Sequence, residues 1–281
     1  MTPLAERIRP NTLDELAGQQ HLAGKGSILR KAIEYGRIPS MILWGPPGTG
    51  KTTIANIIAN TLKVPFFTLS AISAGVKDVR DVIEQAKTKP DCILFIDEIH
   101  RFNKGQQDAL LGAVEKGIIT LIGATTENPS FEVNSALLSR CQVYILKALD
   151  EKDLVQLLHT AIQKDEILKQ KKIELKETAA LINISGGDAR KLLNLLELVV
   201  EAAPSKPPPS GGGYANTQSQ LIEDSHSLEN FPTKKNSPES KDSEKGSSLT
   251  RGGLAGAVLI ITDELVMNIA QKKNCSIRQK W

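Results

Sequence analysis

Residues 41–62 read MILWGPPGTGKTTIANIIANTL, and this stretch decides the fold. Four apolar residues at 41–44 precede Gly-Pro-Pro-Gly-Thr-Gly-Lys-Thr at 45–52, a complete match to the pattern G-x-x-x-x-G-K-[S/T]. Apolar side chains then recur at helical spacing, which predicts an amphipathic helix over 52–62. A strand, a glycine-rich loop and a helix in this order are typical of a loop that binds phosphate groups.

Each residue type in this phosphate-binding loop, residues 45–52, has a chemical task. Glycines let backbone N–H groups converge on phosphate oxygens, and the positive end of the following helix adds to the attraction. Lys51 is expected to reach the β- and γ-phosphates, and the Thr52 hydroxyl to bind Mg²⁺. The residues expected to hold ATP here are Pro47, Gly48, Thr49, Gly50, Lys51, Thr52 and Thr53.

Two adjacent carboxylates follow another apolar run, ILFI at 93–96. Strand ends of an open α/β sheet are where ligands bind, and adjacent acids there are difficult to explain without a cation. We expect Asp97 to hold Mg²⁺, partly through water, and Glu98 to act as general base on the attacking water.

The first half of the chain alternates short apolar runs with helical patterns, which predicts a parallel sheet covered by helices. The predicted strands are 41–44, 64–69, 92–96, 118–124 and 143–146, and their continuous apolar runs suit strands buried on both faces. We assign residues 1–148, including an N-terminal linker, to this α/β domain.

The pattern then becomes helical, with Asp150 and Asp188 as predicted N-caps, and residues 149–203 are expected to form a small all-helical lid. Residues 204–250 are rich in Pro, Gly, Ser and charge, so we expect a disordered linker. The remaining segment, 251–281, is expected to hold a residual C-terminal helix, with Thr262 near its start, and a tail.

Composition sets limits on the function class. No apolar run reaches the roughly 18 residues of a membrane helix, and we expect a cytoplasmic protein without a membrane partner. The net charge of +3 is too small to indicate nucleic-acid binding by itself. Neither the cysteines nor the histidines have the spacing of a metal site; they are Cys92, Cys141, Cys275, His21, His100, His159 and His226.

Several longer motifs carry a resemblance to a known family. GPPGTGKT, the Asp-Glu pair and RPNTLDELAGQ resemble the AAA+ ATPases. DEIHRFNKGQQD, GATTENPSFEVNSALLSRC and GGDARKLLNLLE closely resemble the replication-associated recombination protein A family, whose eukaryotic member is the Werner-helicase-interacting ATPase. The resemblance runs from about residue 3 to 203. It implies a five-stranded parallel sheet of order 5-1-4-3-2, with helices on both faces, followed by the helical lid.

The resemblance also implies roles for further residues. Thr125 matches sensor 1, a polar residue near the γ-phosphate, with Thr126 and Asn128 as alternatives. Arg140 matches the arginine finger that reaches a neighbouring subunit's nucleotide, and Arg190 matches sensor 2, a lid arginine at the γ-phosphate of its own subunit. The residues that match the adenine-binding segment are Ile8, Arg9, Pro10, Gly18 and Gln19.

The function implied is an ATPase acting on DNA in rescue or recombination at stalled replication forks, associated with the nucleoid and with single-strand-binding protein. Lys77, Arg80, Arg101 and Lys104 are candidate DNA contacts, although a solvated face explains them equally well. A clamp-loader-like subunit and a protein-remodelling machine are the alternatives, but residues 71–77 lack the aromatic residue of a threading loop. The family forms homo-oligomers through a C-terminal domain that we expect this sequence largely to lack, so oligomerisation stays open.

Overall fold

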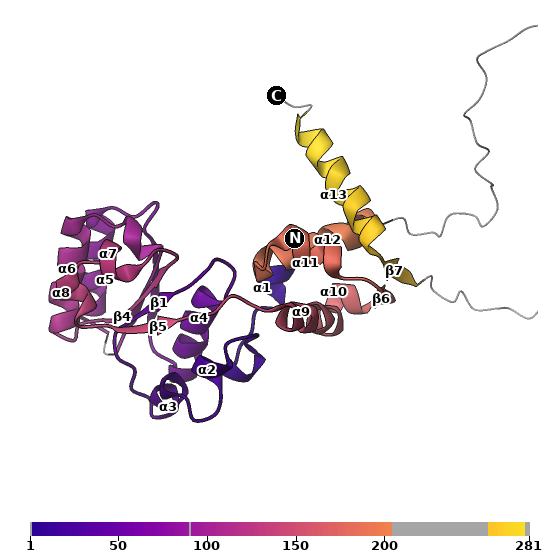
Figure 1. The fold of residues 1–281 in the computed structure, drawn as a ribbon. Helices are drawn as coiled ribbons and strands as arrows, with labels where there is room; N and C mark the ends of the chain where they lie inside the picture. The colour runs from indigo at the N-terminus through magenta and orange to yellow at the C-terminus, as the bar shows by residue number, and fades with distance from the viewer. Residues whose placement is uncertain (1, 90, 204–257, 279–281) are drawn as a thin grey trace, which may run out of the picture. The chain divides into compact units, whose positions relative to one another are not determined.

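The computed structural model describes residues 2–89, 91–203 and 258–278. The described residues up to Ala203 and from Val258 onward belong to one compact unit. Figure 1 shows this unit as a sheet with helices, coloured indigo to magenta, and a mainly helical part, coloured dark red to yellow. The segment 204–250, for which the sequence predicts disorder, lies outside the described residues.

The sheet has five parallel strands in the order β2-β3-β4-β1-β5, which confirms the predicted order 5-1-4-3-2. In each parallel pair the carboxyl ends lie together, with Trp44 opposite Thr125 and Ser70 opposite Asp97. The strands are β1 (Met41–Trp44), β2 (Phe66–Ser70), β3 (Ile93–Asp97), β4 (Thr120–Thr125) and β5 (Gln142–Ile145).

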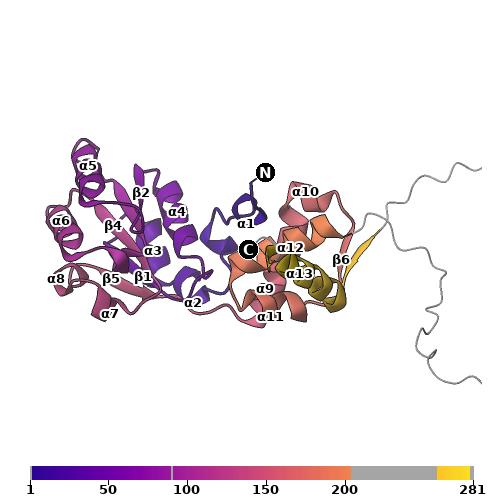
Figure 2. The ribbon, with the colours of Figure 1, turned by 90° about the horizontal axis from the view of Figure 1, so that it is seen from above.

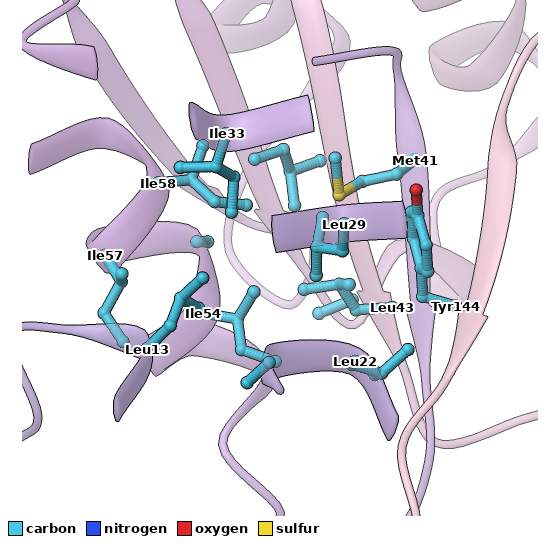
Figure 3. Packing of buried hydrophobic residues seen from close by; sticks show 14 of the residues in the cluster. Leu13, Leu22, Leu29, Ile33, Met41, Leu43, Ile54, Ile57, Ile58 and Tyr144 are labelled. Atoms are coloured by element: carbon cyan, nitrogen blue, oxygen red, sulfur yellow. The ribbon is translucent and has the colours of Figure 1, made fainter. Parts of the chain in front are cut away.

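Helices cover both faces of this sheet. Successive residues of a strand point to opposite faces, so one strand packs against both layers of helices. Met41 and Leu43 pack in one hydrophobic cluster with helices α2 (Gln20–Ala23), α3 (Ile28–Glu34) and α4 (Lys51–Leu62). Ile42 packs in another with α5 (Val76–Ala86), α6 (Lys104–Glu115) and α8 (Ser135–Leu138). Figure 3 shows the first cluster, in which the labelled residues are Leu13, Leu22, Leu29, Ile33, Met41, Leu43, Ile54, Ile57, Ile58 and Tyr144.

Short elements shape the loops that lead to and from the strands. The turn η1 (Leu13–Glu15) precedes α2, and the turn η2 (Ile99–Arg101) follows β3 directly. Helix α7 (Pro129–Glu132) follows β4 and begins at Asn128, whose side chain accepts a hydrogen bond from Ser130 N–H. This bond is a normal helix cap, so the Asn128 side chain has a structural task.

The second part contains α9 (Glu151–Lys164), α10 (Glu166–Lys169), α11 (Ala179–Ser185) and α12 (Ala189–Ala202). As predicted, Asp150 and Asp188 cap α9 and α12 by accepting hydrogen bonds from backbone N–H groups. These four helices share one hydrophobic cluster. The N-terminal helix α1 (Leu4–Arg7) packs into this cluster through Leu4, which is fully buried. We call α9 to α12 and the elements that pack with them the lid.

The prediction of an all-helical lid is wrong in one respect, because the lid contains a small parallel sheet. Strand β6 (Ile173–Leu175) pairs with β7 (Leu259–Ile261), a strand from beyond the low-complexity segment, and both views show the two side by side (Figures 1 and 2). Helix α13 (Asp263–Arg278) follows, and the Asp263 carboxylate accepts a hydrogen bond from Ala180 N–H at the start of α11. Residues 259–278 therefore complete the lid.

No helix in the described part of the chain is long and apolar enough to span a membrane.

Candidate active site

The candidate site lies where β1, β3 and β4 end, and it is a cavity walled on its other side by the lid. Strand β4 lies between β1 and β3, so the loops after all three strands meet at one edge of the sheet. The cavity is lined by Ala5, Ile8, Arg9, Pro10, Glu15, Leu16, Ala17, Pro47, Gly48, Thr49, Gly50, Lys51, Thr52, Thr53, Asp97, Glu98, Thr126, Leu149, Leu157, Asp188, Ala189, Arg190 and Leu193.

The phosphate-binding loop needs its glycines for conformation and for space. Gly48 and Gly50 have φ of +73° and +99°, values that residues with a side chain rarely adopt. A Cβ at Gly48 would lie 2.2 Å from Asp188 Oδ1 and 2.8 Å from the backbone nitrogen of Ala189. The loop backbone therefore packs directly against the start of α12, and only glycine permits this approach.

Lys51 begins α4 and is 7% exposed. Its Nζ donates hydrogen bonds to the carbonyl oxygens of Gly45, at 2.7 Å, and Pro46, at 2.8 Å. Burial lowers the pKa of Lys51 below its usual range, while the negative charges of Glu98 and Asp97 act in the opposite direction. The result is a cation fixed at the floor of the cavity, close to two carboxylates.

Asp97 is the last residue of β3, and Glu98 follows it in an unusual backbone conformation. The φ of Glu98 is +56°, which is uncommon for a residue other than glycine and occurs frequently at functional sites. Both side chains line the cavity, so the structure brings the predicted metal ligand and the predicted base to the same place as Lys51.

Thr125 and Thr126 face different surroundings. Thr125 is fully buried, and its Oγ1 contacts the Glu127 backbone and His100 Nδ1. Thr126 lines the cavity, and its hydroxyl lies 3.5 Å from Glu98 Oε2. Of the three residues considered for sensor 1, Thr126 is the one that lines the cavity.

The N-terminal segment supplies an apolar wall. Ile8, Arg9 and Pro10, predicted to contact adenine, all line the cavity. Further apolar residues reach it from the segment around η1 and from the lid, and sequence reasoning did not single them out; they are Leu16, Ala17, Leu149, Leu157 and Leu193.

Gly18 and Gln19, the other predicted adenine contacts, do not line this cavity. Gln19 is fully buried, and its side-chain amide pairs with the backbone of Lys147 through bonds of 2.8 and 3.1 Å. A Cβ at Gly18, whose φ is +71°, would lie 2.4 Å from Leu149 Cδ2. These two residues join the N-terminal segment to the connection between β5 and the lid.

Arg190 reaches the cavity and Arg140 does not. Arg190 lies in the first turn of α12, beside the phosphate-binding loop. Arg140 follows α8, where its Nη1 donates to the Ala136 carbonyl at 2.8 Å and its Nη2 forms an ion pair with Glu115. Its side chain is 41% exposed. Arg140 is not among the residues that line this cavity.

The donor set fits Mg²⁺. Thr52 and Asp97 both line the cavity, from the start of α4 and the end of β3. Mg²⁺ prefers oxygen ligands and is usually held by one or two protein groups together with phosphates and water. These two side chains are such a set, and Lys51 beside them supplies a positive charge for phosphate.

Besides these apolar residues, the sequence analysis missed the roles of two polar residues at or beside the site. Asp188 was predicted only as a helix cap, yet it lines the cavity and contacts the phosphate-binding loop. His100 was weighed only as a metal ligand, yet it lies against Glu98. No local sequence signal places Asp188 beside Gly48, because that contact depends on how the lid folds back.

Comparison with known sequences finds a matching family model and similar proteins. The model of the "ATPase family associated with various cellular activities (AAA)" matches residues 41–149. Replication-associated recombination protein A of Coxiella burnetii is 53% identical over 206 residues, which are 72% of this chain and 47% of that protein. The ATPase WRNIP1 of Dictyostelium discoideum is 45% identical over 206 residues, 71% of this chain and 24% of that protein. The chain thus spans about half the length, or less, of these relatives.

Solved structures give the same fold. The RuvB Holliday junction branch migration motor of Thermotoga maritima superposes with a TM-score of 0.56 at 32% identity, covering 69% of this chain and 65% of that one.

Proposed function

We propose that this chain, whose residues 41–149 match the AAA family of ATPases and which is 53% identical to a replication-associated recombination protein A over 206 residues, is an ATP-driven motor or switch acting on DNA at stalled replication forks. One observation carries the ATPase part of this proposal. A single cavity holds the phosphate-binding loop, two carboxylates at a strand end, a threonine hydroxyl and a lid arginine.

The lining of the cavity suggests one orientation for ATP. Its phosphates would lie on the loop that contains Gly48 and Gly50, with Lys51 at the β- and γ-phosphates. Its adenine would lie against the apolar wall that includes Ile8 and Pro10. Thr52 and Asp97 would hold Mg²⁺, which when bound neutralises charge on the β- and γ-phosphates.

We assign the role of general base to Glu98, which lines the cavity. Its carboxylate takes a proton from a water molecule as the water oxygen attacks the γ-phosphorus. The bond from that phosphorus to the bridging oxygen breaks, and the products are ADP and phosphate. Thr126 lies beside Glu98, so we assign to Thr126 the contact with the γ-phosphate or the water that the resemblance gave to Thr125.

The two arginines complete the site from different directions. Arg190, in the first turn of α12, would contact the γ-phosphate of the nucleotide in its own chain and so make the lid respond to nucleotide state. Arg140 would act on the nucleotide of a second copy, because it lies outside its own cavity. This assignment implies a homo-oligomer, at least while ATP is hydrolysed.

The DNA part rests on the named relatives and on exposed basic residues. Lys77 and Arg80 lie on α5, and Arg101 and Lys104 lie at η2 and the start of α6, all exposed. Gln106 of α6 donates a hydrogen bond to the Ala74 carbonyl, just before α5, at 2.8 Å. The segments that carry the two basic pairs are therefore in contact. Single-strand-binding protein as a partner and association with the nucleoid belong to the same proposal.

The test is forked-DNA binding by the double variant Lys77→Gln with Arg80→Gln. If both side chains bind phosphates, affinity falls for every DNA sequence, and the slope of log K against log salt decreases by about 1 for each phosphate that is no longer neutralised. The matched control is Lys31→Gln with Lys152→Gln, two exposed lysines on α3 and α9. Equal DNA affinity and equal salt slope in the two double variants would exclude α5 as the DNA-binding surface.

A further inference from the structure

A histidine that the proposed mechanism does not use lies behind the general base. His100 is in the turn η2, two residues after Glu98, and its side chain is only 12% exposed. Its Nδ1 lies 2.9 Å from Thr125 Oγ1 and 3.3 Å from Glu98 Oε2. One ring nitrogen thus contacts both the end of β4 and the carboxylate after β3.

The hydrogen-bond partners determine which groups donate. Thr125 Oγ1 accepts a hydrogen bond from Glu127 N–H at 3.0 Å, and the Glu127 carbonyl, 3.2 Å away, can accept the hydroxyl hydrogen. Thr125 Oγ1 then presents a lone pair to the imidazole. The ionised Glu98 carboxylate is also only an acceptor. With the Thr125 hydrogen directed at Glu127, two acceptors face Nδ1, and we assign a hydrogen to Nδ1, which lies 2.9 Å from Thr125 Oγ1 and 3.3 Å from Glu98 Oε2.

The two residues that the imidazole contacts differ in burial. Thr125 is fully buried at the end of a central strand, and the backbone of Glu127 holds its hydroxyl. Glu98, in contrast, is the residue with the left-handed backbone conformation, and its side chain is 26% exposed at the cavity. The imidazole connects the more exposed side chain, the Glu98 carboxylate, to the buried one.

We propose that His100 is a positioning residue: the Nδ1–H, oriented by Thr125, holds the Glu98 carboxylate in the direction in which it receives the proton from water. The inference rests on the proposed function, because it requires Glu98 to be the base. His100 is not among the residues that line the cavity, and its contact with the site is through Glu98.

The size of the effect follows from similar cases. Groups that orient metal-binding side chains through a hydrogen bond typically contribute about 10- to 100-fold to activity or metal affinity, and we expect an effect of similar size for a group that orients a general base. Nucleotide binding depends on the phosphate-binding loop and the apolar wall, which His100 does not contact. The expected signature is therefore a lower kcat with an unchanged affinity for ATP.

The test compares His100→Leu with His100→Asn in the full chain. The Asn side-chain amide places an N–H where His has Nδ1, whereas Leu fills the space without a donor. We expect His100→Leu to lower kcat about 10- to 100-fold and His100→Asn to retain most of the activity, both with ATP affinity within about 2-fold of the unchanged chain. Equal losses in both variants, or no loss in His100→Leu, would overturn the proposal.

A second variant addresses the possibility that His100→Leu does not fold. Thr125→Val keeps the shape of the side chain and removes the hydroxyl that orients the imidazole, so it should also lower kcat while ATP still binds. Full activity in Thr125→Val would contradict the orienting role of Thr125, and with it the proposal.

Glu98→Gln separates this inference from the proposed function. If Glu98→Gln is inactive and His100→Leu is fully active, the general base stands and the role of His100 fails. If Glu98→Gln retains the turnover of the unchanged chain, the assignment of Glu98 as base fails, and the inference about His100 fails with it. With both residues as proposed, adding His100→Leu to Glu98→Gln causes no further loss.

Discussion

Lys51 and Glu98 line the same cavity, but they contribute to different steps of the proposed reaction. Removing a buried charge that hydrogen-bonds a ligand typically costs about 2 to 5 kcal/mol, so Lys51→Ala should lower ATP affinity by roughly 30-fold or more. Glu98→Gln leaves the phosphate-binding loop intact, so ATP affinity should stay within about 3-fold while turnover falls by roughly 10² to 10⁴. Titration with a fluorescent ATP analogue and a phosphate-release assay measure the two quantities. Equal losses of ATP affinity in both variants would contradict this division.

How well single residues could be predicted depended on whether their role is local. The phosphate-binding loop and the Asp97-Glu98 pair were predictable, because a few adjacent residues set their geometry. Gln19 was assigned to adenine from its place in a motif, but the fold uses its amide to bind the Lys147 backbone. The role of His100 depends on a strand end 25 residues away, which no spacing within the motif reveals.

At the scale of elements, an ion-pair cluster joins α1 to the lid. Arg7 donates to Asp165 at 2.7 Å and to Glu197 at 2.6 Å, and the Asp165 side chain is 3% exposed. Arg7→Met would leave two carboxylates without their partner, and we expect the free energy of unfolding to fall by about 2 to 4 kcal/mol in urea denaturation.

Arg30 provides the matched control for this prediction. It also binds two carboxylates, Asp14 and Glu34, but these are 66% and 62% exposed. Exposed pairs contribute about 1 kcal/mol or less, so Arg30→Met should have a smaller effect. An equal or larger loss in Arg30→Met would show that the Arg7 cluster does not stabilise the fold as described.

The same cluster predicts a dependence on pH. The hydrogen bond from Arg7 holds the pKa of Asp165 below its usual range. A carboxylate with a lowered pKa in the folded state stabilises that state fully above its unfolded value, about 3.9, and less as pH falls below it. The stability difference between the unchanged chain and Arg7→Met should therefore be largest at neutral pH and shrink as pH falls to about 3. A difference that grows on acidification would contradict the cluster's role.

Secondary structure was predicted best where it is long or buried. Strands β1, β3 and β4 were found because they are mostly buried apolar runs at the centre of the sheet. Strands β2 and β5, at its edges, were also found, although several of their residues are exposed. Strands β6 and β7 were missed because each has three residues and its partner lies across a low-complexity segment. A short strand of this kind is stabilised by its distant partner, and local propensity does not reveal it.

At the scale of the whole molecule, the position of Arg140 predicts that ATP turnover needs two copies. An arginine supplied in trans increases turnover by roughly 10³ to 10⁵ in other NTPases, so specific activity should rise with protein concentration. Arg140→Ala and Lys51→Ala chains should each be nearly inactive alone and recover turnover when mixed. In the mixture, a Lys51→Ala chain donates its Arg140 to the intact loop of an Arg140→Ala chain.

The control for the mixing experiment is a chain with both substitutions. Arg140→Ala mixed with the Lys51→Ala, Arg140→Ala double variant has no arginine to donate and should stay inactive. If the first mixture is also inactive, and the unchanged chain has constant specific activity on dilution, Arg140 does not act in trans.

The central claim is that this cavity hydrolyses ATP in response to DNA, and the steady-state rate of phosphate release with and without forked DNA tests it most directly. Glu98→Gln, which should bind ATP without hydrolysing it, provides the blank for contaminating activity. We predict a rate above this blank for the unchanged chain, and an increase in that rate when forked DNA is added. A rate equal to that of Glu98→Gln, both with and without forked DNA, would contradict the account.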